Sequence, residues 1–130
     1  MLMLDTPMIQ TGGFKNTPGG FEIRLRLPYY RGLWANLLEG AAVEVDGEAF
    51  DAAAIRWTIG ERSFTVADLQ EPTDLRWPVD VPAVLAVPRD EPLTIGFHDV
   101  QVELGIRMSY IPEELQPSYW TEQRKLVITR

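Results

Sequence analysis

The sequence contains no cysteine and a single histidine, His98. Without cysteine, the chain cannot form disulfides, thiolate metal sites or a cysteine nucleophile. With one histidine, a zinc or iron site built on several histidines is excluded as well. A Ser-His-Asp triad would have to use His98, which we interpret instead as an ordinary turn or edge residue. The sequence therefore has no pattern typical of a self-sufficient active site.

Basic residues and long apolar runs are also scarce. The formal net charge is -7, from 19 acidic and 12 basic residues, and such a surface repels the phosphate backbone of nucleic acids. No apolar stretch approaches the length of a membrane span. Residues 1–4 are apolar, but Asp5 follows and no basic region precedes them, so we expect no signal peptide. Together with the missing cysteines, this favours a cytoplasmic protein.

Proline and glycine, by contrast, are abundant, with ten of each among 130 residues. This density predicts many short elements rather than a few long helices. The length suits a single domain over residues 1–130, in which 1–13 form either a strand or a loose N-terminal arm.

Alternation of apolar and polar residues predicts strands along the whole chain. The pattern is clearest over 21–27, where Phe21, Ile23, Leu25 and Leu27 share one face. Helix is minimal, with single turns near 67–71 and 113–116. We therefore predict an all-β fold, an antiparallel and jelly-roll-like β-sandwich of about eight strands. The expected strands are 21–27, 43–45 followed by an Asp46-Gly47 hairpin turn, 55–59, 64–66, 75–77, 84–87, 100–110 with a bend at Gly105, and 125–130.

Two aromatic groups are candidates for a binding surface. The first follows the best strand and has the composition of an interaction hot spot, although the same residues could instead close the edge of the core. The second lies in an expected proline-rich loop before the last strand, where a partner surface and simple loop packing compete. The first group is Pro28, Tyr29, Tyr30, Arg31, Gly32 and Trp34, and the second is Tyr110, Pro112, Tyr119 and Trp120, with Pro117 between them.

Four segments of the sequence resemble the small subunit, or beta subunit, of bacterial C-glycoside deglycosidases. They occur in the family's order and at similar spacing, so that the resemblance covers roughly residues 14–130. The most specific parts are PYYRG at 28–32 and TDLRW at 73–77. The full segments are FEIRLRLPYYRG at 21–32, VEVDGE at 43–48, TDLRW at 73–77 and RMSYIP at 107–112.

The resemblance implies a β-sandwich without catalytic residues that docks on a larger subunit. That alpha subunit is similar to sugar-isomerase TIM barrels and carries a divalent metal of the Mn or Mg type together with the acid–base residues. The implied substrate is a 3-oxo-C-glycoside, whose C3 ketone acidifies the C2 proton, so that a base and a metal can drive elimination of the aglycone carbon. Carried over to this sequence, Tyr29, Tyr30 and Arg31 are expected at the subunit contact, near the mouth of the partner's active site.

Two other functions compete with this one. A stand-alone carbohydrate-binding module would use exposed tryptophans as platforms, and Trp34, Trp57, Trp77 and Trp120 are its candidates. The apolar strand neighbours of Trp57 and Trp77 favour burial for those two. An independent small enzyme would need an internal base, for which His98 supplies the only imidazole.

Overall fold

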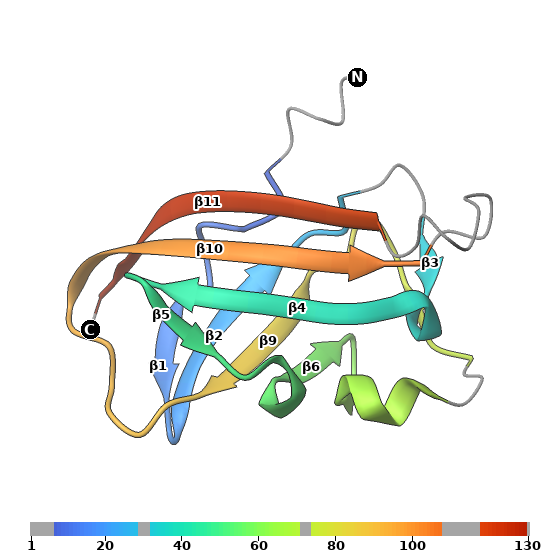
Figure 1. Ribbon diagram of the computed structural model, residues 1–130, viewed down its shortest axis with the longest axis horizontal. Helices are drawn as coiled ribbons and strands as arrows, with labels where there is room; N and C mark the ends of the chain where they lie inside the picture. Colours follow the sequence, from blue (N-terminus) through green and yellow to red (C-terminus); the bar gives the residue numbers. More distant parts are fainter. Residues whose placement is uncertain (1–6, 29–31, 71–73, 108–117, 130) are drawn as a thin grey trace.

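Two antiparallel sheets pack face to face in the computed structural model, which describes residues 7–28, 32–70, 74–107 and 118–129 (Figure 1). The predicted antiparallel β-sandwich is confirmed. The described residues contain eleven strands rather than about eight, because several pairings are only two or three residues long. Helix is limited to three short 3-10 turns in the described residues: η2 (Ala35–Leu37), η3 (Ala52–Ala54) and η4 (Val66–Gln70).

The first sheet has five strands in the order β1-β2-β9-β6-β7. Its central strand is β9, and β2 lies between β9 and β1. The alternating apolar residues of β2 are buried on the inner face as the sequence predicts. The expected continuous burial of the 84–87 run is only partial, because alternate residues of β9 are half-buried. The strands are β1 (Lys15–Thr17), β2 (Gly20–Leu25), β6 (Arg56–Ile59), β7 (Arg62–Phe64) and β9 (Ala83–Pro88).

The second sheet has four strands in the order β11-β10-β4-β5, and two further strands, β3 and β8, pair as a separate ribbon. The predicted hairpin turn joins β4 to β5, with φ of 51° at Asp46 and 88° at Gly47. Such left-handed values suit the Asp-Gly pair of a tight hairpin. The strands are β3 (Leu33–Trp34), β4 (Leu38–Val45), β5 (Glu48–Phe50), β8 (Arg76–Trp77), β10 (Gly96–Ile106) and β11 (Ser118–Ile128).

The last strand begins earlier than the sequence suggests. We expected it at 125–130, with Tyr119 and Trp120 in a preceding loop, but β11 runs from Ser118 to Ile128 and both aromatics belong to it. The alternation is hidden because two inward positions, at 122 and 124, hold Glu and Arg. The predicted irregularity at Gly105 is confirmed as a shift in the register between β10 and β4.

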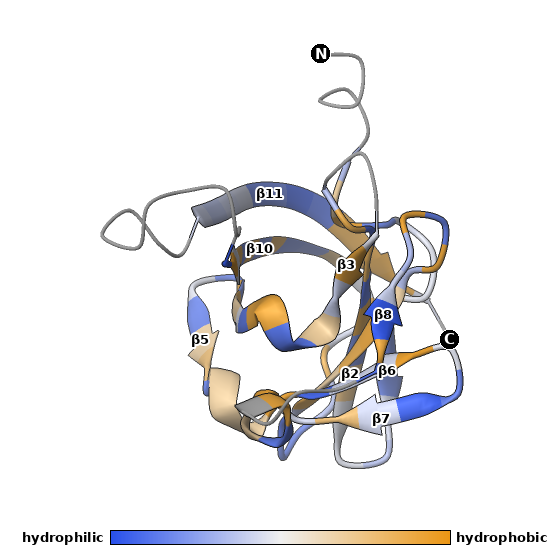
Figure 2. Ribbon diagram, turned by 90° about the vertical axis from the view of Figure 1, so that its right-hand side faces the viewer, coloured by the Kyte–Doolittle hydropathy of each residue, from blue (hydrophilic) through white to orange (hydrophobic). Residues whose placement is uncertain are grey.

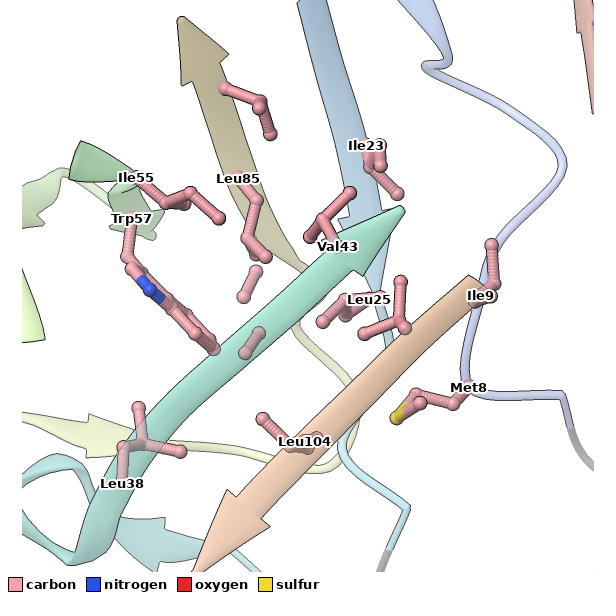
Figure 3. Packing of buried hydrophobic residues seen from close by; sticks show 14 of the residues in the cluster. Met8, Ile9, Ile23, Leu25, Leu38, Val43, Ile55, Trp57, Leu85 and Leu104 are labelled. Carbon is pink, nitrogen blue, oxygen red and sulfur yellow. The ribbon is translucent and has the colours of Figure 1, made fainter. Parts of the chain in front are cut away.

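The two inner faces form one hydrophobic cluster (Figure 3). Val43 and Leu104 come from the second sheet and meet Ile23 and Leu85 from the first. Among the described residues, the buried side chains are almost all apolar, and His98 is the buried polar exception. Among the described residues, no helix is long and apolar enough to cross a membrane.

The N-terminal segment closes one side of the sandwich. Ile9 pairs with Leu25 at the edge of β2, and both Met8 and Ile9 are buried. A carboxylate oxygen of Glu122 on β11 accepts hydrogen bonds from Met8 N at 2.6 Å and Ile9 N at 2.9 Å. Arg124 donates to the Ile9 carbonyl at 2.8 Å. Residues 8–10 are therefore fixed to both sheets, whereas residues 1–6 lie outside the described part of the chain.

Candidate functional site

The ribbon of β3 and β8 joins the two sequence segments that carry the family resemblance most specifically. Leu33 pairs with Trp77 and Trp34 with Arg76, so the end of the PYYRG segment lies beside the TDLRW segment, 44 residues further along. Figures 1 and 2 place β3 at the end of the sandwich where β10 finishes and β11 begins. The sequence singled out both segments but did not predict that they pair.

The inward residues of the ribbon anchor it to the core. Trp77 is fully buried and its indole N–H donates to the Val81 carbonyl at 2.9 Å. Its ring meets that of Trp57 edge to face, with centroids 5.8 Å apart. Leu33 is buried as well. Rigid anchoring of this kind presents the outward residues in one fixed arrangement.

The outward residues of the ribbon form a small aromatic and cationic surface. The side chain of Trp34 is 45% exposed, which makes it the most exposed tryptophan among the described residues. The guanidinium carbon of Arg76 lies 4.8 Å from the centroid of the Trp34 ring. Stacking of this type stabilises both side chains and pre-orders them for contact with a partner. We call Gly32, Trp34 and Arg76 the ribbon surface.

Gly32 is needed for the close packing of this surface. A Cβ at this position would lie 3.1 Å from the Trp77 carbonyl oxygen. The Gly32 carbonyl also accepts a hydrogen bond from Arg76 Nη2 at 3.2 Å, which helps to hold the guanidinium over Trp34. The role of Arg76 was missed from the sequence, because only the pairing of β3 with β8 brings it to the tryptophan.

The other predicted interface residues divide into two groups. Pro28 is half-buried just beyond β2, while Tyr29, Tyr30 and Arg31 lie outside the described residues, as do Tyr110 and Pro112. Tyr119 is 61% exposed on the outer face of β11, and Trp120 packs partly against the core. The second aromatic group is thus not a single loop, because neighbouring residues of a strand point to opposite faces.

A pocket of about 650 Å³ is lined in part by Asn36 of η2, the turn that directly follows β3 in the sequence. Its apolar lining includes Leu38, Val66 and Leu69. An ion pair between Arg107 Nη1 and Glu39 Oε2, 3.4 Å apart, supplies charged groups. Such a mixed lining suits a side chain of a partner or a small amphipathic molecule.

His98 is buried within β10 and is not the turn or edge residue that the sequence suggested. Its Nδ1 lies 2.6 Å from Asp46 Oδ2 and its Nε2 lies 2.7 Å from the Thr94 carbonyl oxygen. Burial alone would lower the pKa of His98, but these two acceptors outweigh it, so the pKa is raised. With both nitrogens engaged, His98 ties the β4–β5 turn to the segment before β10.

Two of the four proposed sugar platforms are absent from the surface. Trp57 and Trp77 are fully buried, and one face of Trp34 carries Arg76. Within the described residues, no group of three or more His, Cys, Asp or Glu side chains is placed to hold a metal ion. The ribbon surface is therefore the best-defined candidate site in the described part of the chain.

Comparisons with known proteins agree with the resemblance seen in the sequence. The family model for the C-glycoside deglycosidase beta subunit matches residues 4–110. A C-glycoside deglycosidase beta subunit from Eubacterium cellulosolvens is 28% identical over 130 residues, covering 95% of this chain and 88% of the relative.

Two further relatives are more similar over shorter lengths. A 3'-dehydrocarminate deglycosidase beta subunit from a Microbacterium species is 37% identical over 98 residues, covering 75% of this chain and 74% of the relative. A C-glycoside deglycosidase beta subunit from Arthrobacter globiformis is 33% identical over 112 residues, with 84% and 83% covered. The matched family model and these relatives lead to one conclusion: the chain belongs to the C-glycoside deglycosidase beta subunit family.

Proposed function

We propose that this chain is the non-catalytic beta subunit of a C-glycoside deglycosidase and docks on a larger catalytic subunit through the ribbon surface. The observation that carries the proposal is the stacked pair of Trp34 and Arg76, held outward by a ribbon that joins the two segments most specific to the family. Tryptophan and arginine are the residue types that most often dominate binding energy at protein interfaces.

The chemistry of the reaction assigns the catalytic groups to the partner. In a 3-oxo-C-glycoside, a base removes the C2 proton, and the electrons of that bond form an enediolate across C2 and C3. As the C3 ketone re-forms, those electrons make a double bond between C1 and C2. The pair from the C1–aglycone bond leaves with the aglycone carbon, which takes up a proton. The step needs a base and an acid, and a divalent metal would stabilise the enediolate. We assign these to a TIM-barrel alpha subunit, and His98 is unsuited to the role because both its nitrogens are engaged.

Within the complex, this chain would brace the catalytic subunit rather than react with the substrate. In the sequence, residues 29–31 stand between Pro28 and Gly32, and they remain the predicted contact near the partner's active-site mouth. A cytoplasmic location remains a prediction from the lack of cysteine.

The test is turnover of a 3-oxo-C-glucoside by the catalytic subunit with and without this chain, after co-elution is checked on a sizing column. We expect both activity and the joint peak to require the chain. Trp34→Ala should weaken subunit binding roughly 10- to 30-fold, because it removes a large exposed anchor. A catalytic subunit that is fully active alone would contradict the proposal.

Two variants serve as controls for the ribbon surface. Arg76→Lys keeps the charge but loses the planar group over Trp34, so it should weaken binding less than Arg76→Ala. Lys15→Ala removes an exposed cation from β1, the edge strand of the five-stranded sheet, and should leave binding unchanged. Equal losses from Arg76→Ala and Lys15→Ala, with no loss from Arg76→Lys, would point to net charge rather than to a specific surface.

A further inference from the structure

Strand β11 is a long edge strand whose register with β10 is unbroken. Each residue from Ser118 to Ile128 has a partner on β10, from Ile106 back to Gly96, with no shift. Among the described residues, β10 is the only strand that pairs with β11. The strand contains no proline or bulge, two common devices for blocking an edge. Its inward-pointing charges, Glu122 and Arg124, are held by the backbone of Met8 and Ile9 within the same chain. An edge of this kind is a template for another strand.

The orientation of the free backbone groups follows from one hydrogen bond. Asp46 N donates to the Asp99 carbonyl at 2.8 Å, so the N–H and C=O of Asp99 face β4 rather than β11. Successive residues of a strand turn their N–H and C=O groups to opposite edges. Two residues that lie directly opposite each other turn these groups either both toward one another or both away. Lys125 lies opposite Asp99 and therefore turns its backbone groups to the free edge. The same holds for the odd-numbered residues of β11: Tyr119, Thr121, Gln123, Lys125 and Val127.

From this edge we infer that β11 pairs with β11 of a second copy of the chain, antiparallel and centred on Gln123. The twofold axis then passes through the midpoint of the strand, so its whole length is paired. Gln123 faces Gln123 of the second copy, and both have free N–H and C=O groups to exchange. The two four-stranded sheets become one continuous sheet.

The sequence of β11 is self-complementary in this register. Glu122 lies opposite Arg124 of the second copy, and Trp120 lies opposite Leu126. On the outer face, Tyr119 lies opposite Val127. Opposite charges and aromatic–aliphatic pairs are favourable when they face each other across strands. In this register, charged residues thus face residues of opposite charge, and apolar residues face apolar ones.

The neighbouring registers lack this match. Centring the pair on Glu122 places two glutamates opposite each other, and centring it on Arg124 places two arginines opposite each other. Like charges directly opposite are destabilising. Both alternatives also leave strand ends unpaired. Charge and length therefore select the register centred on Gln123.

Exposed apolar side chains at both ends of the strand support a second copy as the occupant. Tyr119 is 61% exposed and Val127 is 39% exposed, and Phe97, directly opposite Val127 on β10, is 72% exposed. Pairing brings Tyr119 of one copy beside Val127 and Phe97 of the other. Contacts of this kind cover apolar surface that a monomer leaves in water.

The test is sedimentation equilibrium of the whole chain over a range of concentrations, with two variants at Thr121. In the proposed dimer, Thr121 lies opposite Lys125 of the second copy. Thr121→Lys should weaken the dimer and Thr121→Glu should strengthen it, each about three- to tenfold, because the contact occurs twice. Within its own chain, Thr121 lies opposite Glu103, so the effects on monomer stability should have the reverse order.

That reversal separates pairing between copies from changes inside one copy. A third variant, Gln123→Pro, removes an N–H that points to the free edge rather than to β10, and it should give a monomer that retains its fold. A wild-type chain that stays monomeric at every concentration would overturn the inference. A dimer whose dissociation constant is unchanged in both Thr121 variants would also overturn it. The same holds if the wild type never self-associates but binds a different protein, and Gln123→Pro abolishes that binding.

Discussion

At the scale of the residue, the most informative side chain is His98. It is the chain's only histidine, and both ring nitrogens face acceptors within 2.7 Å. Two acceptors require two donors, so the geometry favours the protonated imidazolium. The pKa of Asp46 is lowered, first by the hydrogen bond from Asp99 N and then by the bond to His98. Asp46 and His98 thus form an ion pair that links the β4–β5 turn to β10, and we call this pair the clasp.

This clasp predicts a window of pH in which it stabilises the fold. A raised His98 pKa gives stability that is complete below its usual value of 6.5 and is lost as pH rises through the folded pKa. A lowered Asp46 pKa gives stability that is present above its usual value of 3.8 and is lost as pH falls through the folded pKa. Urea unfolding should therefore show the clasp's contribution at mildly acidic pH and its loss at alkaline pH.

Asp46→Asn is the variant that tests the clasp. Asparagine tolerates the positive φ of this turn, so the hairpin is preserved. We expect the His98 pKa to fall and the free energy of unfolding at pH 6 to drop by about 1 kcal/mol. Because there is only one histidine, its NMR signal can be titrated without ambiguity. A His98 pKa equal in the two proteins would contradict the role assigned to Asp46.

At the scale of the element, the closest packing against a glycine occurs in the β2–β9 pair, at Gly20 of β2. A Cβ on Gly20 would lie 2.0 Å from the Val87 carbonyl oxygen, whereas a Cβ on Gly12 would have no neighbour within 4 Å. Gly12 precedes β1 and Gly20 is the first residue of β2, so the two glycines are close in sequence but differ in their surroundings. The requirement for glycine at position 20 comes from the sheet, not from the turn beside it.

Gly20→Ala should therefore force β9 away from β2. We expect a loss of about 2–4 kcal/mol in the free energy of unfolding, comparable to overpacking in a core. The matched variant Gly12→Ala should be neutral or slightly stabilising, because it only restricts the unfolded chain. Thermal or urea unfolding of both variants measures the difference, and equal stability would show that β9 shifts without cost.

At the scale of the whole molecule, the sandwich presents two separate proposed contacts. The ribbon surface is built by β3 and β8, which form their own small sheet, and the self-pairing edge is β11 of the four-stranded sheet. No residue is shared between them. A hetero-oligomer in which each beta subunit also pairs with another would use both contacts at once and would thereby join two of the proposed catalytic units.

The two contacts should respond independently to substitution. Trp34→Ala should weaken binding to the catalytic subunit and leave self-association unchanged, while Thr121→Lys should do the reverse. Distant substitutions without shared partners usually act additively, so the double variant should show both losses at their single-variant size. Light scattering combined with a binding titration measures the two equilibria, and a change in both from either single variant would mean that one surface serves both contacts.

The sequence alone determined the fold class and much of the local structure. Alternation in β2 and the Asp46-Gly47 turn are local patterns, and both are as predicted because strand periodicity and left-handed turns depend on residues close in sequence. The four segments of the family resemblance likewise identified the family. Only the tertiary structure decided which distant segments meet: Arg76 over Trp34, Asp46 on His98, and Glu122 holding Met8 and Ile9. Those contacts depend on strand order and register, and a polar residue facing inward, as in β11, hides its role until its partner is in place.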